Sequence, residues 1–288
     1  MSDSDQQSLA NAKVNLSLRV QSPRSDGLHP IRGVFQSVDW ADEVRLSATD
    51  ADDVVVSGLA VPEDETNLAW RAADAVRRIA ESEEPLRVSL HKSVPDGAGL
   101  GGGSADAAAA LILASRRFGV PFEDVRRLAV DLGADVPFAL VGGTAIVGGI
   151  GELVQPEPDA VDFALAIVVP DVALATASVY SEWDSLDGPA GPIHPDGALP
   201  PALRDLSPFA NDLYPAAVSI EPRIDDWRNE LEGTWGVPVA MTGSGSALFA
   251  YFSSLDEAKD AIAAAPAPAR ASRAVSPTNH GWRILEEE

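Results

Sequence analysis

The sequence predicts an α+β fold, and three observations lead to this class. The first ninety or so residues read largely as strands, without the repeated strand–helix units of a doubly wound α/β protein. A strand over 86–94, a glycine-rich loop and a helix over 104–118 then follow directly. Further strands are expected over 163–169 and on both sides of a glycine turn within 239–251. Strands and helices in separate runs are typical of α+β proteins.

Composition sets limits on the kind of protein. A length of 288 residues suffices for two lobes that share a cleft, and we place them at 1–151 and 152–288. The absence of cysteine excludes disulfides, thiolate zinc sites and a cysteine nucleophile. A net charge of −23 argues against a nucleic-acid partner. Without a signal-like N-terminus or a long apolar run, the sequence predicts a cytoplasmic protein with no membrane partner. The oligomeric state, monomer or homodimer, remains open.

The N-terminal region is expected to be built of strands. Residues 12–20 alternate, with Val14 and Leu16 on one face and Lys13 and Asn15 on the other, which is typical of a half-buried strand. Short strands over 31–38, 43–47 and 54–57 are predicted to form an antiparallel meander. A helix over 66–80 follows, capped by Thr66 or Asn67.

The glycine-rich loop is the strongest functional signal. Five glycines lie within seven positions, between a strand and a helix with Ser104 as its predicted N-cap and Gly119 as its stop. This arrangement directs backbone N–H groups and a helix N-terminus toward a phosphate. The segment fits G-x-G-x-x-G, but Pro95 and Asp96 separate the strand from the first glycine, unlike a dinucleotide fingerprint. Gly103 stands where a Walker A loop has lysine. We therefore favour phosphate binding over a flexible linker.

Later segments complete the predicted framework. A helix from Pro121 to Gly133, with Phe122 and Val125 facing inward, is followed by Asp135, a carboxylate that could cap the next turn. A long loop over 184–206, a helix capped by Asn211, and a final edge strand are expected.

Residues 94–108 resemble the central motif of the GHMP kinases, a family of small-molecule kinases. The segments A-K-V-N-L at 12–16, L-G-A-D-V-P at 132–137 and T-G-S-G at 242–245 extend the resemblance over nearly the whole chain. It implies a two-lobed α+β fold with a nucleotide-binding lobe, a ferredoxin-like C-terminal lobe and the active site between them. Phosphoryl transfer from ATP, accompanied by Mg²⁺, is the implied reaction.

The resemblance also implies roles for individual residues. Asp135 would be the catalytic carboxylate and Lys13 its catalytic partner, while no metal ligand is assigned; Glu123 is a weak candidate because it looks exposed. The residues expected to bind ATP or its phosphates are Pro95, Gly97, Gly99, Leu100, Gly101, Gly102, Gly103, Ser104, Lys92 and Asn67.

Within the family, the turn Asp26-Gly27-Leu28-His29 is similar to D-G-Y-H of the kinases whose substrate is a cytidine-diphosphate-linked methylerythritol. It departs from them at Leu28, where an aromatic residue would stack on cytosine; Tyr180 would cover the other face of the base. The residues expected to bind substrate are Asn15, Asp26, Leu28, His29, Thr176, Tyr180, Gly243 and Ser244. A related kinase for another alcohol, such as homoserine or mevalonate, and a non-catalytic nucleotide-binding protein are the alternatives.

Overall fold

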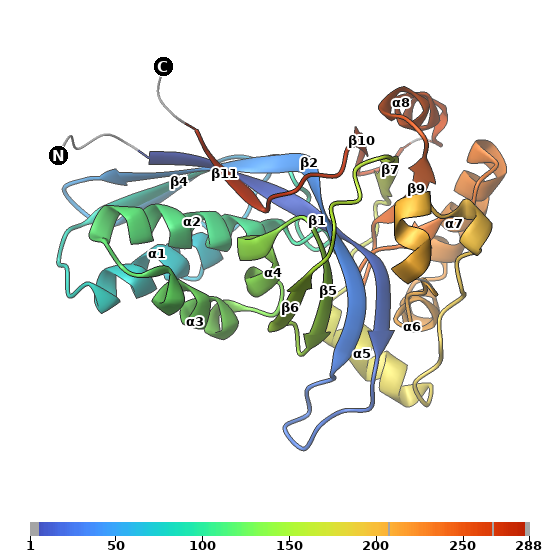
Figure 1. Cartoon of the computed structure of the whole chain (residues 1–288), viewed down its shortest axis with the longest axis horizontal. Coiled ribbons are helices and arrows are strands. Elements are labelled where there is room, and N and C mark those ends of the chain that lie inside the picture. Colours follow the sequence, from blue (N-terminus) through green and yellow to red (C-terminus); the bar gives the residue numbers. More distant parts are fainter. Residues whose placement is uncertain (1–5, 207, 267, 286–288) are drawn as a thin grey trace.

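The structure, a computed structural model, describes residues 6–206, 208–266 and 268–285. Its larger sheet contains seven strands in the described part of the chain, in the order β11-β1-β2-β4-β3, with β5 paired to β2 and β6 paired to β5 (Figure 1). These strands are β1 (Gln6–Val20), β2 (Ile31–Ala48), β3 (Asp53–Gly58), β4 (Leu86–Lys92), β5 (Thr144–Gly149), β6 (Leu153–Pro156) and β11 (Trp282–Leu285).

Strand β2 organises this sheet because its two halves have different neighbours. The first half, from Ile31 to Gln36, pairs with β5, whereas the second, from Glu43 to Ala48, pairs with β4. The prediction of separate strands over 31–38 and 43–47 is therefore wrong. The intervening Asp39-Trp40-Ala41-Asp42 contains neither glycine nor proline, and Trp40 and Asp42 are both buried, so the strand continues. The predicted antiparallel meander is also wrong, because β3 pairs in parallel with β4, and a helix connects these two strands along the chain.

Four helices pack on one face of the larger sheet (Figure 1): α1 (Leu68–Ile79), α2 (Gly102–Phe118), α3 (Phe122–Leu132) and α4 (Val136–Val141). The buried alanines of α2 let it approach α1 and the sheet closely. Asn67 caps α1, since its side chain accepts a hydrogen bond from Ala69 N. Ser104 is not an N-cap as predicted: α2 begins two residues earlier, after Gly101 in the left-handed conformation. Phe122 is 51% exposed rather than inward-facing.

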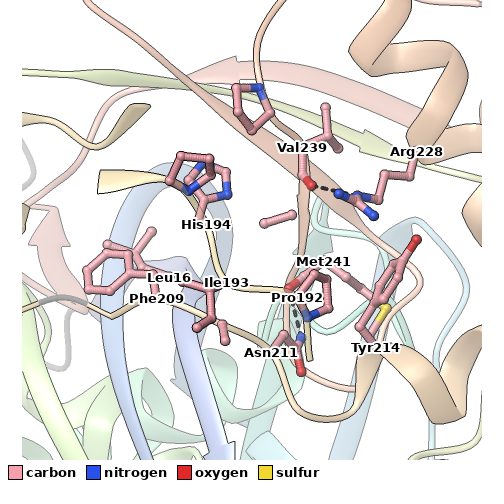
Figure 2. Close-up of a pocket in the computed structure, with 14 residues that line it drawn as sticks. Leu16, Pro192, Ile193, His194, Phe209, Asn211, Tyr214, Arg228, Val239 and Met241 are labelled. Carbon is pink, nitrogen blue, oxygen red and sulfur yellow. Dashed lines mark hydrogen bonds between the residues drawn. The ribbon is translucent and has the colours of Figure 1, made fainter. Parts of the chain in front are cut away.

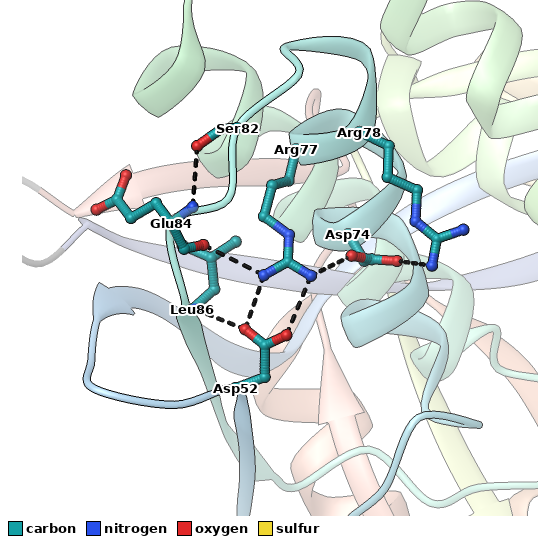
Figure 3. A network of polar contacts seen from close by, with 7 residues as sticks. All are labelled: Asp52, Asp74, Arg77, Arg78, Ser82, Glu84 and Leu86. Atoms are coloured by element: carbon teal, nitrogen blue, oxygen red, sulfur yellow. Dashed lines mark hydrogen bonds and ion pairs between the residues drawn. The ribbon is translucent and has the colours of Figure 1, made fainter.

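A polar network fixes α1 to the start of β4, the strand that leads into the glycine loop (Figure 3). Arg77 forms a bidentate ion pair with Asp52, at 2.7 and 3.1 Å, and a further contact of 2.5 Å with Asp74. Asp52 also accepts a hydrogen bond from Leu86 N, and Arg77 donates to the carbonyl of Glu84. Bidentate arginine–carboxylate geometry restricts orientation, so the network holds this end of the lobe in register.

The smaller sheet has the order β10-β7-β9-β8, with all pairs antiparallel. The chain runs from β7 through helices to β8 and β9, then through a helix to β10, which is the expected ferredoxin-like arrangement. The predicted strand over 163–169, the hairpin within 239–251 and the final edge strand β11 are confirmed. The elements are β7 (Ala164–Val169), α5 (Thr176–Ser185), η1 (Asp196–Ala198), η2 (Pro201–Leu206), α6 (Tyr214–Ile220), α7 (Arg223–Trp235), β8 (Ala240–Met241), β9 (Leu248–Phe252), α8 (Leu255–Ala264) and β10 (Ala271–Val275).

The two sheets share a core, which explains why β1 is buried on both faces rather than on one. Val14 and Leu16 pack in one cluster with Leu165, Ile167 and Phe249 of the smaller sheet. On the opposite face Lys13 and Asn15 are also buried. Strands β6 and β11 lie in the larger sheet although their residues follow position 151. The division at 151 stays a prediction. None of the described helices is both long and apolar enough to cross a bilayer.

Candidate functional site

Strand β1 directs Lys13 and Asn15 toward one point. The pairing of β1 with β2 shifts register between Asn11 and Lys13 and again between Asn15 and Ser17. Such irregularities re-aim side chains and are common beside functional sites. The ammonium of Lys13 donates to Asn15 Oδ1 at 2.5 Å and lies 3.2 Å from Asp135 Oδ2.

Asp135 occupies the N-cap position of α4, but its side chain makes no capping hydrogen bond. The local capping role that the sequence left open is therefore not used. The carboxylate instead forms the ion pair with Lys13. The side chain of Asp135 is 31% exposed and that of Lys13 only 8%, so the carboxylate is the member that a substrate can reach.

The glycine loop passes over Lys13, and its conformation depends on residues without a side chain. Gly97, Gly99 and Gly101 all have positive φ, at +64°, +77° and +69°, a region that other residues rarely adopt. A Cβ at Gly99 would lie 2.3 Å from the carbonyl oxygen of Thr242, whereas the space beside Gly97 and Gly103 is open. The loop ends at the N-terminus of α2, whose first N–H groups lack partners within the helix. Open space and unpaired N–H groups are what a phosphate requires.

The turn between β8 and β9 locks this loop in place. Thr242 Oγ1 accepts from Asn15 N at 2.8 Å and donates to Gly99 O at 3.1 Å. Asn211 donates to the carbonyls of Met241 and Gly243, each at 2.8 Å. Asn211 was predicted to cap a helix, but α6 begins only at Tyr214. The signal for Thr242 was its place within the T-G-S-G segment.

A cleft of about 770 Å³ lies beside the ion pair and brings together four predicted substrate residues: Leu28, His29, Thr176 and Tyr180. The rings of His29 and Tyr180 are 5.1 Å apart. Burial, together with the charge of Asp135, raises the pKa of Tyr180 to about 12, so its hydroxyl remains protonated at neutral pH. Ala134, which precedes Asp135, lines the cleft, and the charge of Asp135 acts on Tyr180 of the cleft wall, so the carboxylate lies near the cleft.

The remaining predicted substrate residues have structural contacts. Asp26 does not line the cleft; its carboxylate accepts from Leu28 N and pairs with Arg24, which shapes the turn. Ser244 Oγ lies 3.0 Å from Thr176 Oγ1 and thereby joins the β8–β9 turn to α5. Their contacts with substrate stay predictions.

Lys92 lies behind the glycine loop in a buried cluster that the sequence did not reveal. Its ammonium is 2.5 Å from both Asp42 Oδ2 and Asp106 Oδ2. Burial lowers the pKa of Lys92, but the two carboxylates raise it by a larger amount, so the net shift of the pKa is upward. Burial raises the pKa of Asp106 to about 7, against the attraction of Lys92. Asp42 also accepts hydrogen bonds from the N–H groups of Ser93 and Val94.

The other predicted nucleotide residues are also engaged within the fold. Asn67 uses its side chain to cap α1 and to donate to Pro62 O. Leu100 and Pro95 are buried, and the carbonyl of Leu100 accepts from Lys13 N at 2.9 Å. The nucleotide contacts of Asn67 and Lys92 stay predictions.

A second, smaller cavity of about 50 Å³ lies behind β8 (Figure 2). It is lined by His194, Arg228, Asn211 and Met241, and by none of the predicted site residues. Burial and the charge of Arg228 lower the pKa of His194 to about 4, so this side chain is neutral at physiological pH. Two of its lining residues, Asn211 and Met241, also support the glycine turn, since Asn211 donates to the carbonyls of Met241 and Gly243.

Comparisons with known proteins agree with this geometry. Residues 67–143 match the GHMP kinases N terminal domain, and residues 199–271 match the GHMP kinases C terminal domain. Proteins named 4-diphosphocytidyl-2-C-methyl-D-erythritol kinase are 34% identical in Chlorobium limicola and 37% identical in Geobacter sulfurreducens. The alignments cover 87% and 86% of this chain, respectively, and 90% of each relative.

Solved structures show the same fold. A crystal structure of 4-(cytidine 5'-diphospho)-2C-methyl-D-erythritol kinase, 34% identical, superposes with a TM-score of 0.78 over 94% of this chain and 98% of that one. A homoserine kinase from Cytophaga hutchinsonii, 20% identical, has a TM-score of 0.70 over 99% of this chain and 98% of its own. This second likeness concerns the fold alone.

Proposed function

The chain belongs to the GHMP kinases, and on this basis we propose that it phosphorylates the 2-hydroxyl of 4-diphosphocytidyl-2-C-methyl-D-erythritol with ATP. The relatives that bear this activity in their names share 33–37% of their residues with this chain. One observation carries the proposal: Lys13 packs against Gly101 of the glycine loop, and its partner Asp135 follows Ala134, which lines the cleft that contains His29 and Tyr180. ATP and a nucleotide-linked alcohol can therefore approach the same carboxylate from two sides.

The phosphates of ATP would lie against the glycine loop. Both nearby lysines, Lys13 and Lys92, are already paired with carboxylates. Backbone N–H groups and the N-terminus of α2 would therefore provide most of the positive potential that the phosphates need. Open space beside Gly97 and Gly103 allows close approach of phosphate oxygens.

Asp135 would orient the acceptor hydroxyl and accept its proton as the oxygen attacks the γ-phosphorus. Lys13 would offset charge on the transferring group, since its ammonium lies 3.2 Å from the Asp135 carboxylate. Asn15 holds the lysine through Oδ1, and Thr242 holds Asn15 in turn. Phosphoryl transfer depends mainly on positioning and charge stabilisation, and this chain of contacts supplies both.

Mg²⁺ would arrive on the ATP phosphates. No group of three His, Cys, Asp or Glu side chains able to hold a metal occurs among the described residues. Mg²⁺ usually keeps several waters and binds through one or two carboxylates together with substrate phosphates, so ATP would supply part of its ligands. Glu123 is exposed on α3 beside Arg126 and Arg127 and is not a candidate ligand. When bound, the ion would neutralise phosphate charge.

Asp135→Asn tests the proposed role of the carboxylate. The amide keeps the shape of the side chain but accepts a proton poorly, so kcat should fall by about 10²–10⁴-fold while the KM for ATP stays within about threefold. Asp131→Asn, an exposed position four residues away on α3, is the matched control and should retain full activity. A kcat of Asp135→Asn within tenfold of the unmodified protein would exclude Asp135 as the proton acceptor.

A further inference from the structure

Helix α5 spans the cleft from the glycine turn to the β1–β2 hairpin. Thr176, Tyr180 and Asp184 recur every four residues and therefore lie along one face of the helix, and all three line the cleft. At one end, Thr176 contacts Ser244 of the β8–β9 turn at 3.0 Å. At the other end, Asp184 Oδ2 lies 3.3 Å from His29 Nε2. Asp184 was not among the residues predicted to bind substrate.

The imidazole of His29 is held in one orientation. Its side chain is only 8% exposed. Nδ1 lies 3.1 Å from the carbonyl oxygen of Gln21, which can only accept, so Nδ1 carries the proton of this hydrogen bond. The rings of Tyr180 and Trp183 flank the imidazole at 5.1 and 5.5 Å. A ring with so little freedom provides a fixed wall of the cleft.

Asp184 retains hydrogen-bonding capacity at one carboxylate oxygen. Its side chain is 44% exposed, and within the described part of the chain Oδ1 has no partner. An ionised carboxylate is an acceptor at both oxygens. The far end of the cleft therefore presents a free acceptor beside an aromatic surface, which suits a planar base with an amino group on its edge.

We infer that Asp184 selects cytosine over uracil, an inference that rests on the proposed function. The exocyclic amino group of cytosine is a donor that Asp184 can accept. Uracil has a carbonyl oxygen at the same position, and its lone pairs would oppose the carboxylate. A site built to pair with one group discriminates strongly against an analogue that leaves it unpaired.

A purely structural role makes a different prediction. If Asp184 only orients His29, its removal weakens the binding of both bases to the same extent. If Asp184 accepts a hydrogen bond from the amino group, its removal weakens the binding of the cytosine ligand but not the binding of the uracil ligand. The ratio of the two affinities therefore separates the two roles.

The test measures binding of CDP and UDP by calorimetry, with ADP saturating the ATP site. The unmodified protein should bind CDP at least about tenfold more tightly than UDP, as expected for one hydrogen bond to a charged group. Asp184→Ala should reduce this ratio to below about threefold. With the full substrate, the same variant should raise KM while kcat stays within about twofold. Glu182→Gln is the matched control on α5, where Glu182 contacts Ser219 instead, and should leave the ratio unchanged.

Each outcome is decisive. A CDP preference that survives in Asp184→Ala, or no preference in the unmodified protein, would overturn the inference while leaving the kinase assignment intact. Failure of the unmodified protein to bind either nucleotide, and to turn over the cytidine-linked substrate, would overturn the proposed function and the inference with it.

Discussion

Gly99→Ala should be one of the most damaging single-methyl changes in this protein, because two independent penalties coincide there. The φ of Gly99 is +77°, and left-handed geometry costs a residue with a Cβ about 1–2 kcal/mol. The added Cβ would also lie 2.3 Å from Thr242 O, so the β8–β9 turn must retreat by roughly 0.7 Å to reach the shortest contact that Cβ atoms show. That retreat breaks the hydrogen bonds of Thr242 with Asn15 and Gly99, each worth about 1 kcal/mol.

We therefore expect Gly99→Ala to lower the free energy of unfolding by about 3–4 kcal/mol, measured by urea denaturation. Gly119→Ala is the matched control, because Gly119 has a φ of +69° and nothing within 4 Å of the added Cβ. It should cost only the left-handed penalty of about 1–2 kcal/mol. Because Thr242 supports Asn15 and thereby Lys13, kcat should fall in Gly99→Ala alone. Equal destabilisation by the two variants would refute the claim that the turn packs against the loop.

Three further predictions follow from the charges and the cleft. The pKa of Asp106 is raised to about 7 in the folded protein, so its contribution to the free energy of unfolding declines as pH rises from about 4 to 7. Asp106→Asn should lack this decline when unfolding is measured at pH 5 and pH 7. The pKa of His194 is lowered to about 4 in the folded protein, so its contribution to the free energy of unfolding is complete above pH 6.5 and is lost on acidification. His194→Gln should lose less stability between pH 6.5 and 4.5 than the unmodified protein. Leu28→Tyr should tighten CDP binding by about two- to tenfold through stacking, and an unchanged Kd would mean that the base lies elsewhere.

The sequence alone allowed much of the site to be predicted where local chemistry is distinctive. The glycine cluster predicted a loop that must adopt positive φ, and alternation in β1 placed Lys13 and Asn15 on one face. The likeness at 132–137 drew attention to Asp135, which the structure brings to Lys13.

Other features depend on partners distant in sequence and therefore escaped prediction. The contact of Lys92 with Asp42 joins residues fifty positions apart, and Asp184 meets His29 across the two lobes. Polar residues in an apolar strand give no sign of which buried carboxylate will neutralise them. The start of α2 was misplaced because the left-handed Gly101, rather than the side chain of Ser104, ends the loop.

ATP turnover with three acceptors tests the central claim most directly. 4-Diphosphocytidyl-2-C-methyl-D-erythritol, homoserine and mevalonate would each be supplied with ATP and Mg²⁺, and ADP release would be followed. Turnover with the cytidine-linked alcohol alone, at rates of about 1–100 s⁻¹, is the predicted result. Turnover of homoserine or mevalonate in preference to it, or of none of the three, would contradict the account.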